Sequence, residues 1–274
     1  MMGSLLIRGM LVGILAGLLA FGFAKVFGEP QVDKAIAFEE AHSREADKPA
    51  AMPGMAMPNQ PEQKASDAAP ANAMPGMQMG QSDQDQGDVE LVSRPMQASF
   101  GLLTGVLTYG IAMGGMFALV FAFAQGRLGR LTPRGTAALI AMAGFAAVVI
   151  IPQLKYPANP PAIGNPETIG PRTALYFGML AISVLSMIVA FMTAQGLAQR
   201  FGRWNGTLIA AAIYLAIAFV AMLVLPAVNE VPSDFSADVL WRFRVASLGI
   251  HVVLWTTYGI VFGIVAERLL QRRV

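Results

Sequence analysis

Cysteine is absent from this chain of 274 residues, and histidine occurs only twice. The lack of thiolates excludes a cysteine-ligated metal site. Charged residues are also scarce, at 13% of the chain. The sequence has no G-x-x-x-x-G-K-[ST], no H-E-x-x-H and no G-x-S-x-G motif, so nothing points to an ATP-driven motor, a zinc peptidase or a serine hydrolase. The chain is therefore not expected to be an enzyme or to hold a permanent cofactor.

Apolar residues are abundant instead. They make up 55% of the chain and give a mean hydropathy of +0.55, which is too apolar for a soluble domain of this length. Six windows approach the length of about 20 residues that crosses a bilayer. They cover residues 5–27, 100–124, 135–151, 173–194, 206–225 and 246–266. The sequence therefore predicts an all-α membrane protein of about six transmembrane helices.

The charges are distributed asymmetrically along the chain. Region 28–99 carries twelve acidic residues against five basic ones, whereas the short links 125–134 and 195–205 carry only positive charge. Because short positive loops stay in the cytoplasm, we expect both termini to be cytoplasmic in a bacterial inner membrane. Regions 28–99, 152–172 and 227–245 would then be external.

These patterns divide the chain into three parts. Residues 1–28 form a first transmembrane helix, interpreted as an uncleaved anchor, although Arg8 before an apolar run also resembles a signal peptide. Residues 29–99 form an acidic, Met-rich external loop, of which 29–48 either continue the first helix or form a short amphipathic one. Its Pro- and Gly-rich part, 49–90, is predicted to be disordered. Residues 100–274 form a five-helix membrane core.

Glycine ladders run through several of these helices. The first window carries Gly9, Gly13 and Gly17, and the second carries Gly110 and Gly114. Small residues at this spacing let helix backbones approach closely, so the ladders predict a tightly packed bundle.

Two methionine clusters stand in the predicted disordered region, "MPGMAMP" at 52–58 and "MPGMQMG" at 74–80. Core packing does not explain them there, and thioether sulfur is a soft ligand that prefers Cu(I)-like ions. The clusters are either metal-contacting or a duplicated low-complexity tract without a ligand. The candidate ligands are Met52, Met55, Met57, Met74, Met77 and Met79.

Both histidines are candidate metal ligands. His42 follows Glu39 and Glu40, and Glu39 and His42 share a face if the segment is helical. Imidazole and carboxylate suit divalent first-row metals, but the segment also fits a solvated charged helix.

His251 lies inside the last apolar window. Helical spacing aligns it with Arg244, Ser247, Trp255 and Tyr258, so this stripe is expected to face the bundle. His251 either lines a transport path or donates one hydrogen bond near the membrane interface.

The loop 152–172 contains six prolines, which predict a stiff and specifically shaped segment. Its string "KYPANPPAIGNPETIGPRT", together with "AFEEAH" and the glycine-ladder first helix, resembles the CbtA-type predicted cobalt transporter subunits. The resemblance covers roughly 1–45 and 100–270. It implies an integral membrane protein of five or six helices that moves cobalt for cobalamin synthesis, beside a small CbtB-type companion subunit.

The leading hypothesis is a transporter, or transporter subunit, for a divalent transition metal, with Co(II) first. Capture is assigned to Glu39, Glu40 and His42, and His251 is expected to line the path. The mouth of the path is assigned to Tyr156, Asn159, Asn165 and Glu167.

Two alternatives remain: a copper-handling protein that acts through its methionine clusters, and a membrane scaffold whose proline loop docks a partner. Apart from lipid and the companion subunit, no partner is expected, and the few basic residues at the membrane faces do not indicate nucleic-acid binding.

Overall fold

A computed structural model describes residues 2–46, 93–129, 131–161 and 163–271. The described residues contain no strand and include six helical spans long and apolar enough to cross a membrane, which confirms the predicted fold class. The spans are Met2–Arg44, Arg94–Ala124, Pro133–Lys155, Pro166–Phe201, Arg203–Val224 and Ala237–Gln271. The predicted disorder at 49–90 lies outside the described residues.

Most spans consist of α-helices joined end to end by short π-helical segments. The α-helices are α1 (Met2–Phe23), α2 (Glu29–Ala46), α3 (Arg94–Met96), α4 (Leu102–Ala124), α5 (Pro133–Gly144), α6 (Ile151–Lys155), α7 (Ile169–Phe201), α8 (Arg203–Val224), α9 (Ala237–Thr257) and α10 (Gly263–Gln271). The π-helical segments are η1 (Ala24–Gly28), η2 (Gln97–Gly101), η3 (Phe145–Ile150) and η5 (Tyr258–Phe262), and η4 (Pro166–Thr168) is a 3₁₀ turn.

The helices run further than the apolar windows do. The first span continues through η1 into α2, so residues 29–46 of the segment 29–48 extend the first helix. Its 43 residues extend about 65 Å, roughly twice the thickness of the hydrocarbon core. At the boundary between α7 and α8, Gly202 adopts a φ of 82° that other residues rarely reach.

The proline loop is shorter than predicted. Pro152 stands in the first turn of α6, where a missing backbone N–H is tolerated, and α6 continues to Lys155. The irregular segment therefore covers only 156–165, which we call the proline loop from here on. The segment between α8 and α9, residues 225–236, is likewise shorter than the predicted 227–245 and is called the α8–α9 loop.

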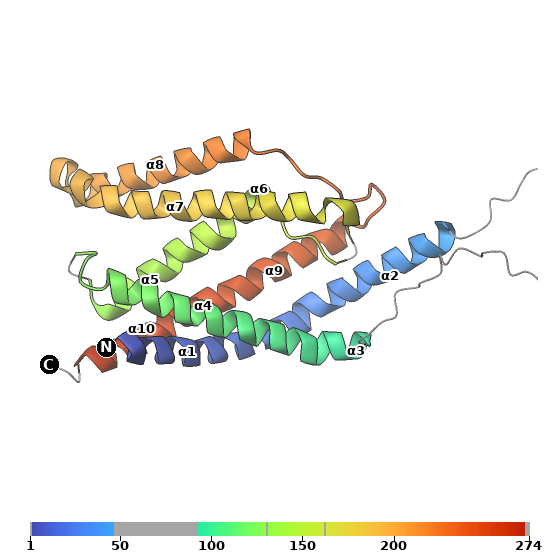
Figure 1. Ribbon diagram of the computed structural model, residues 1–274, viewed down its shortest axis with the longest axis horizontal. Coiled ribbons are helices and arrows are strands. Elements are labelled where there is room, and N and C mark those ends of the chain that lie inside the picture. The colour runs from blue at the N-terminus through green and yellow to red at the C-terminus, as the bar shows by residue number, and fades with distance from the viewer. Residues whose placement is uncertain (1, 47–92, 130, 162, 272–274) are drawn as a thin grey trace, which may run out of the picture.

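The helices pack around two apolar cores. One core joins α1, α4, α5, α9 and α10, and the other joins α6, α7 and α8. In Figure 1, α7 and α8 lie together along one edge of the molecule, while α1 and α4 lie along the opposite edge. The start of α1 and the end of α10 lie at one end of the bundle, and α2 projects from the other end, which we call the α2 end (Figure 1).

Glycine makes the contact between α1 and α4 possible. A Cβ added to Gly110 would lie 2.6 Å from the carbonyl oxygen of Gly13, and one added to Gly9 would meet the backbone of Gly114. The two helices therefore touch backbone to backbone, as the ladders predicted. Tyr258 fixes a third helix to this contact because its hydroxyl donates a hydrogen bond to the Gly110 carbonyl, at 3.0 Å.

Replacing Gly110 with alanine is expected to destabilise the protein by about 1–3 kcal/mol, since the new methyl group must push two backbones apart. The measurement is the thermal unfolding midpoint of the purified protein in detergent. Gly105→Ala on the same helix is the matched control, because a Cβ at Gly105 meets nothing within 4 Å. Equal midpoints for the two variants would show that the glycine contact does not hold α1 against α4.

Candidate functional site

A cavity of about 560 Å³, lined by apolar and polar residues, lies at the α2 end of the bundle. Its walls come from the end of α6, the proline loop, the first turns of α7, the α8–α9 loop and α9. The polar residues that line it are Gln153, Tyr156, Asn159, Arg172, Thr173, Tyr176, Asn229, Arg244, Ser247 and His251. A cavity with several convergent polar groups is the usual form of a small-ligand site.

The stripe predicted on the last span does face the interior. Arg244, Ser247 and His251 line the cavity, and Trp255 and Tyr258 continue the same face into the buried core. His251 lies two turns, about 10 Å, deeper along α9 than Arg244. The helix therefore presents polar groups near the α2 end and apolar groups below them.

His251 sits at the inner wall of the cavity. Its Nδ1 atom is buried and has no hydrogen-bond partner among the described residues. The Tyr109 ring of α4 stands edge-on to the imidazole, with 6.2 Å between ring centroids and 75° between the planes. An unpaired polar atom in a buried position is costly, and such positions often have a functional reason.

Two predicted mouth residues, Tyr156 and Asn159, line the cavity together with His251. The Tyr156 hydroxyl donates to the carbonyl of Pro226 at 2.8 Å, which ties the proline loop to the α8–α9 loop. Arg244 donates from Nη2 to the side-chain oxygen of Asn159 at 3.0 Å, and from Nε to the Ala158 carbonyl at 3.2 Å. These bonds hold the cavity wall to α9.

The other two predicted mouth residues, Asn165 and Glu167, are exposed and do not line the cavity. The side chain of Asn165 accepts a hydrogen bond from the Glu167 backbone N–H at 2.9 Å, which caps the η4 turn. Asn165 therefore shapes the rim of the cavity.

Glu230 of the α8–α9 loop holds this rim in place. Its carboxylate accepts hydrogen bonds from the Thr168 hydroxyl at 2.6 Å and the Asn165 backbone N–H at 2.9 Å, and Arg172 Nη1 lies 3.3 Å away. The two hydrogen bonds and the positive charge of Arg172 hold the pKa of Glu230 below its usual value. Glu230 thus connects the two loops and the start of α7.

A family model described as a probable cobalt transporter subunit (CbtA) matches residues 2–267. The chain belongs to this family. Comparison with the curated proteins and with the solved structures found no match. The CbtA family is one of transporter subunits, and the six spans make this member a multi-pass membrane protein. The word "subunit" in the family description implies that a CbtA protein works with a companion.

In this CbtA protein the predicted capture residues are exposed on α2. His42 Nε2 lies 2.6 Å from Asp234 Oδ2, and Glu40 Oε2 lies 3.4 Å from Arg44 Nη2. Within the described ranges, no group of three His, Cys, Asp or Glu side chains is placed to hold a metal ion. The structure therefore pairs His42 with the α8–α9 loop, and the described residues form no three-ligand site that includes Glu39 and Glu40. The six methionines of the two clusters lie outside the described residues.

A small apolar cluster borders the cavity on the α2 side. Ala35 and Phe38 of α2 pack with Ile163 of the proline loop and with Phe235 and Val231 of the α8–α9 loop. Ile163 and Val231 also line the cavity, so this cluster, which we call the roof, borders it directly. The contact of His42 with Asp234 lies beside the roof, because the His42 ring packs against Phe38 with 4.3 Å between ring centroids.

Sequence reasoning missed Arg172 and the pairing of Glu230. Arg172 directly precedes an apolar window, and a lone arginine at that position could have been recognised as a residue that reaches into a polar site. Glu230 gave no local signal, because its partners lie about 60 residues earlier in the chain.

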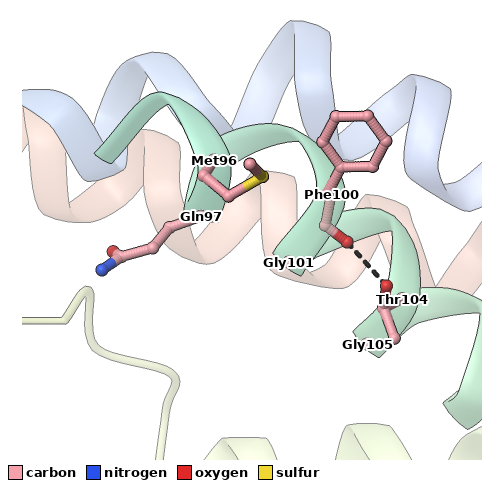
Figure 2. A pocket seen from close by; sticks show the side chains of 6 residues that line it. All are labelled: Met96, Gln97, Phe100, Gly101, Thr104 and Gly105. Carbon is pink, nitrogen blue, oxygen red and sulfur yellow. Dashed lines mark hydrogen bonds between the residues drawn. The ribbon is translucent and has the colours of Figure 1, made fainter. Parts of the chain in front are cut away.

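A second, shallower hollow of about 620 Å³ lies on the surface of η2 and α4. Figure 2 shows its lining: Met96, Gln97, Phe100, Gly101, Thr104 and Gly105. The Thr104 hydroxyl donates to the Phe100 carbonyl at 2.7 Å, so it is already used within the helix. No charged side chain lines this hollow, and we assign the candidate site to the cavity beneath the roof.

Glu230 is expected to make stability depend on pH. Because its pKa is lower in the folded than in the unfolded protein, its contribution is complete above the usual carboxyl range and is lost as the pH falls through the lowered value. Glu230→Gln should therefore lower the thermal unfolding midpoint at pH 7. Between pH 7 and pH 3 the midpoint of this variant should also fall by less than that of the wild type. The exposed neighbour Glu167→Gln is the control, and an unchanged pH profile for Glu230→Gln would contradict the assignment.

Proposed function

We propose that this protein is a subunit that carries cobalt, as Co(II), across the bacterial inner membrane to supply cobalamin synthesis. The family match over residues 2–267 carries the proposal. The polar cavity supports it, since a membrane protein that moves an ion needs a hydrophilic site within its apolar bundle. The roof borders this cavity on the α2 side, so in the proposed path the ion passes the roof.

The residues act in sequence along the path. Glu39, Glu40 and His42 attract the cation at the surface of α2, and the rim around Asn165 and Glu167 guides it toward the roof. Tyr156 and Asn159 then form the mouth of the cavity, and His251 contacts the cobalt at the inner wall. Neutral imidazole is a suitable ligand for divalent cobalt. The methionine clusters serve as an accessory contact for soft ions, and the companion is a small CbtB-type membrane subunit.

His251→Gln is expected to lower cobalt uptake about tenfold, the usual order of effect when a metal-site residue is lost. The measurement is uptake of radioactive cobalt by cells that lack their own importers and express this chain together with its companion. Val252→Ala is the matched control, because Val252 adjoins His251 and is 48% exposed. If His251→Gln takes up cobalt as well as the wild type does, His251 does not line the path. If the wild type takes up no cobalt, the cobalt proposal is overturned.

The same assay separates the capture residues from the methionines. The double variant Glu39→Ala with His42→Ala should take up less cobalt at limiting concentration, whereas deletion of 49–90 should leave cobalt uptake intact. If no form imports cobalt but the deletion changes copper accumulation or tolerance, the protein handles copper through its methionines. If metal contents are unchanged throughout and a partner binds through residues 152–172, the protein is a scaffold.

We also propose that the α2 end faces the periplasm. Arg127 and Arg203 lie at the opposite end of the bundle, where α1 begins and α10 ends, and short positive loops stay in the cytoplasm. Because the chain has no cysteine, single cysteines report sidedness without background. Ser233→Cys should react with a membrane-impermeant maleimide on intact cells, and Asn205→Cys only after lysis. The reverse pattern would invert the topology.

A further inference from the structure

The charges around the cavity are unusual for a site that admits a free cation. Three basic side chains line it, those of Arg172, Arg244 and His251, and no Asp or Glu is among its lining residues. The nearest carboxylate contact is Glu230, which touches Arg172 from the rim and is already hydrogen-bonded to Thr168 and Asn165. The arginines are effectively always charged, so the cavity carries net positive charge.

A bare Co(II) ion fits this cavity poorly. The guanidinium of Arg244 repels a dication, and that of Arg172 does so less because Glu230 partly offsets its charge. The repulsion is stronger where protein and lipid exclude water. No His, Cys, Asp or Glu triad within the described part of the chain offsets the repulsion. The cavity is also large for a lone ion. Six waters of hydration occupy about 180 Å³, roughly a third of the approximately 560 Å³ available.

The same groups suit a carboxylate. A guanidinium presents a planar fork of N–H donors that matches a carboxylate, which is why arginine is favoured where carboxylates are recognised. Arg172 Nε is buried without a hydrogen-bond partner among the described residues, as is His251 Nδ1. The other N–H groups of the two arginines already have partners: Arg172 contacts Glu230 and the Asn165 carbonyl, and Arg244 donates to Asn159 and the Ala158 carbonyl. A bound carboxylate would replace some of these contacts.

We propose that the cavity binds cobalt together with a small carboxylate-bearing chelator, and does not bind the free ion. Arg172 and Arg244 hold the carboxylates of the complex, and His251 supplies an imidazole to the metal. The net negative charge of such a complex removes the repulsion that a free dication meets. The metal part of this inference rests on the proposed cobalt function.

The test is calorimetric titration of the purified full-length protein with three probes: Co(II) chloride, citrate, and the 1:1 Co(II)–citrate complex. The complex is expected to bind at least about ten times more tightly than Co(II) alone. Arg244→Gln and Arg172→Gln should each weaken binding of the complex about tenfold. His251→Gln should weaken binding of the complex and leave that of citrate alone unchanged.

Arg242→Gln is the matched control. Arg242 is on the same helix as Arg244, but its side chain is 61% exposed, binds Asp238 at 2.8 Å and does not line the cavity. Arg244→Lys keeps the charge and removes the fork, so it separates carboxylate recognition from simple attraction. It should bind the complex more weakly than the wild type even when its thermal midpoint is unchanged.

The inference is overturned if the complex binds no more tightly than Co(II) alone, or if Arg244→Gln binds Co(II) as well as the wild type binds the complex. Cobalt uptake by cells would then still support the proposed function. If the purified protein binds the complex through Arg172 and Arg244 but cells import no cobalt in any form, the chelate-binding site is supported and the proposed cobalt transport is contradicted.

Discussion

The backbone contact between α1 and α4 determines where the other parts of the bundle lie. Gly13 and Gly110 let the two helices meet without intervening side chains. This close approach leaves the Gly110 carbonyl within reach of the Tyr258 hydroxyl. In an apolar bundle a buried hydroxyl needs such a partner, so the bond favours one rotational setting of the last span. That setting turns Arg244, Ser247 and His251 toward the cavity.

The second apolar core completes the site from the other side. Helices α7 and α8 form a hairpin that contacts the rest of the molecule mainly through η3 and α6. Lys155 at the end of α6 donates to the Met222 carbonyl at 2.7 Å, which satisfies a free acceptor in the last turn of α8. The cavity thus lies where two separately packed units meet, and polar bonds more than apolar packing fix their junction at this end.

Sequence patterns predicted the elements of this fold better than their contacts. Apolar windows identified all six spans, because the length of an apolar stretch can be read directly from neighbouring residues in the sequence. They misplaced the helix ends, since polar residues such as those of α2 continue a helix beyond the apolar layer. The polar stripe on α9, which contains His251 and Arg244, was also predicted correctly, because helical spacing depends only on residues within one segment. The bonds of Glu230 join residues about 60 positions apart, and no pattern in one sequence encodes such a pairing.

The acidic region also has a different meaning in the structure than in the sequence. Its excess of carboxylates suggested a surface that attracts cations, yet among the described residues three of its twelve carboxylates, those of Glu29, Asp33 and Glu40, have a basic partner at short range. Arg94 lies 2.8 Å from both Glu29 and Asp33, and Arg44 lies 3.4 Å from Glu40. Outside this region, Asp234 contacts His42 and Asp238 contacts Arg242. Exposed pairs of this kind add little stability, but they reduce the field that each carboxylate projects. The paired carboxylates therefore attract a free dication less than their number implies, which agrees with the proposal that the cavity takes cobalt as an anionic complex.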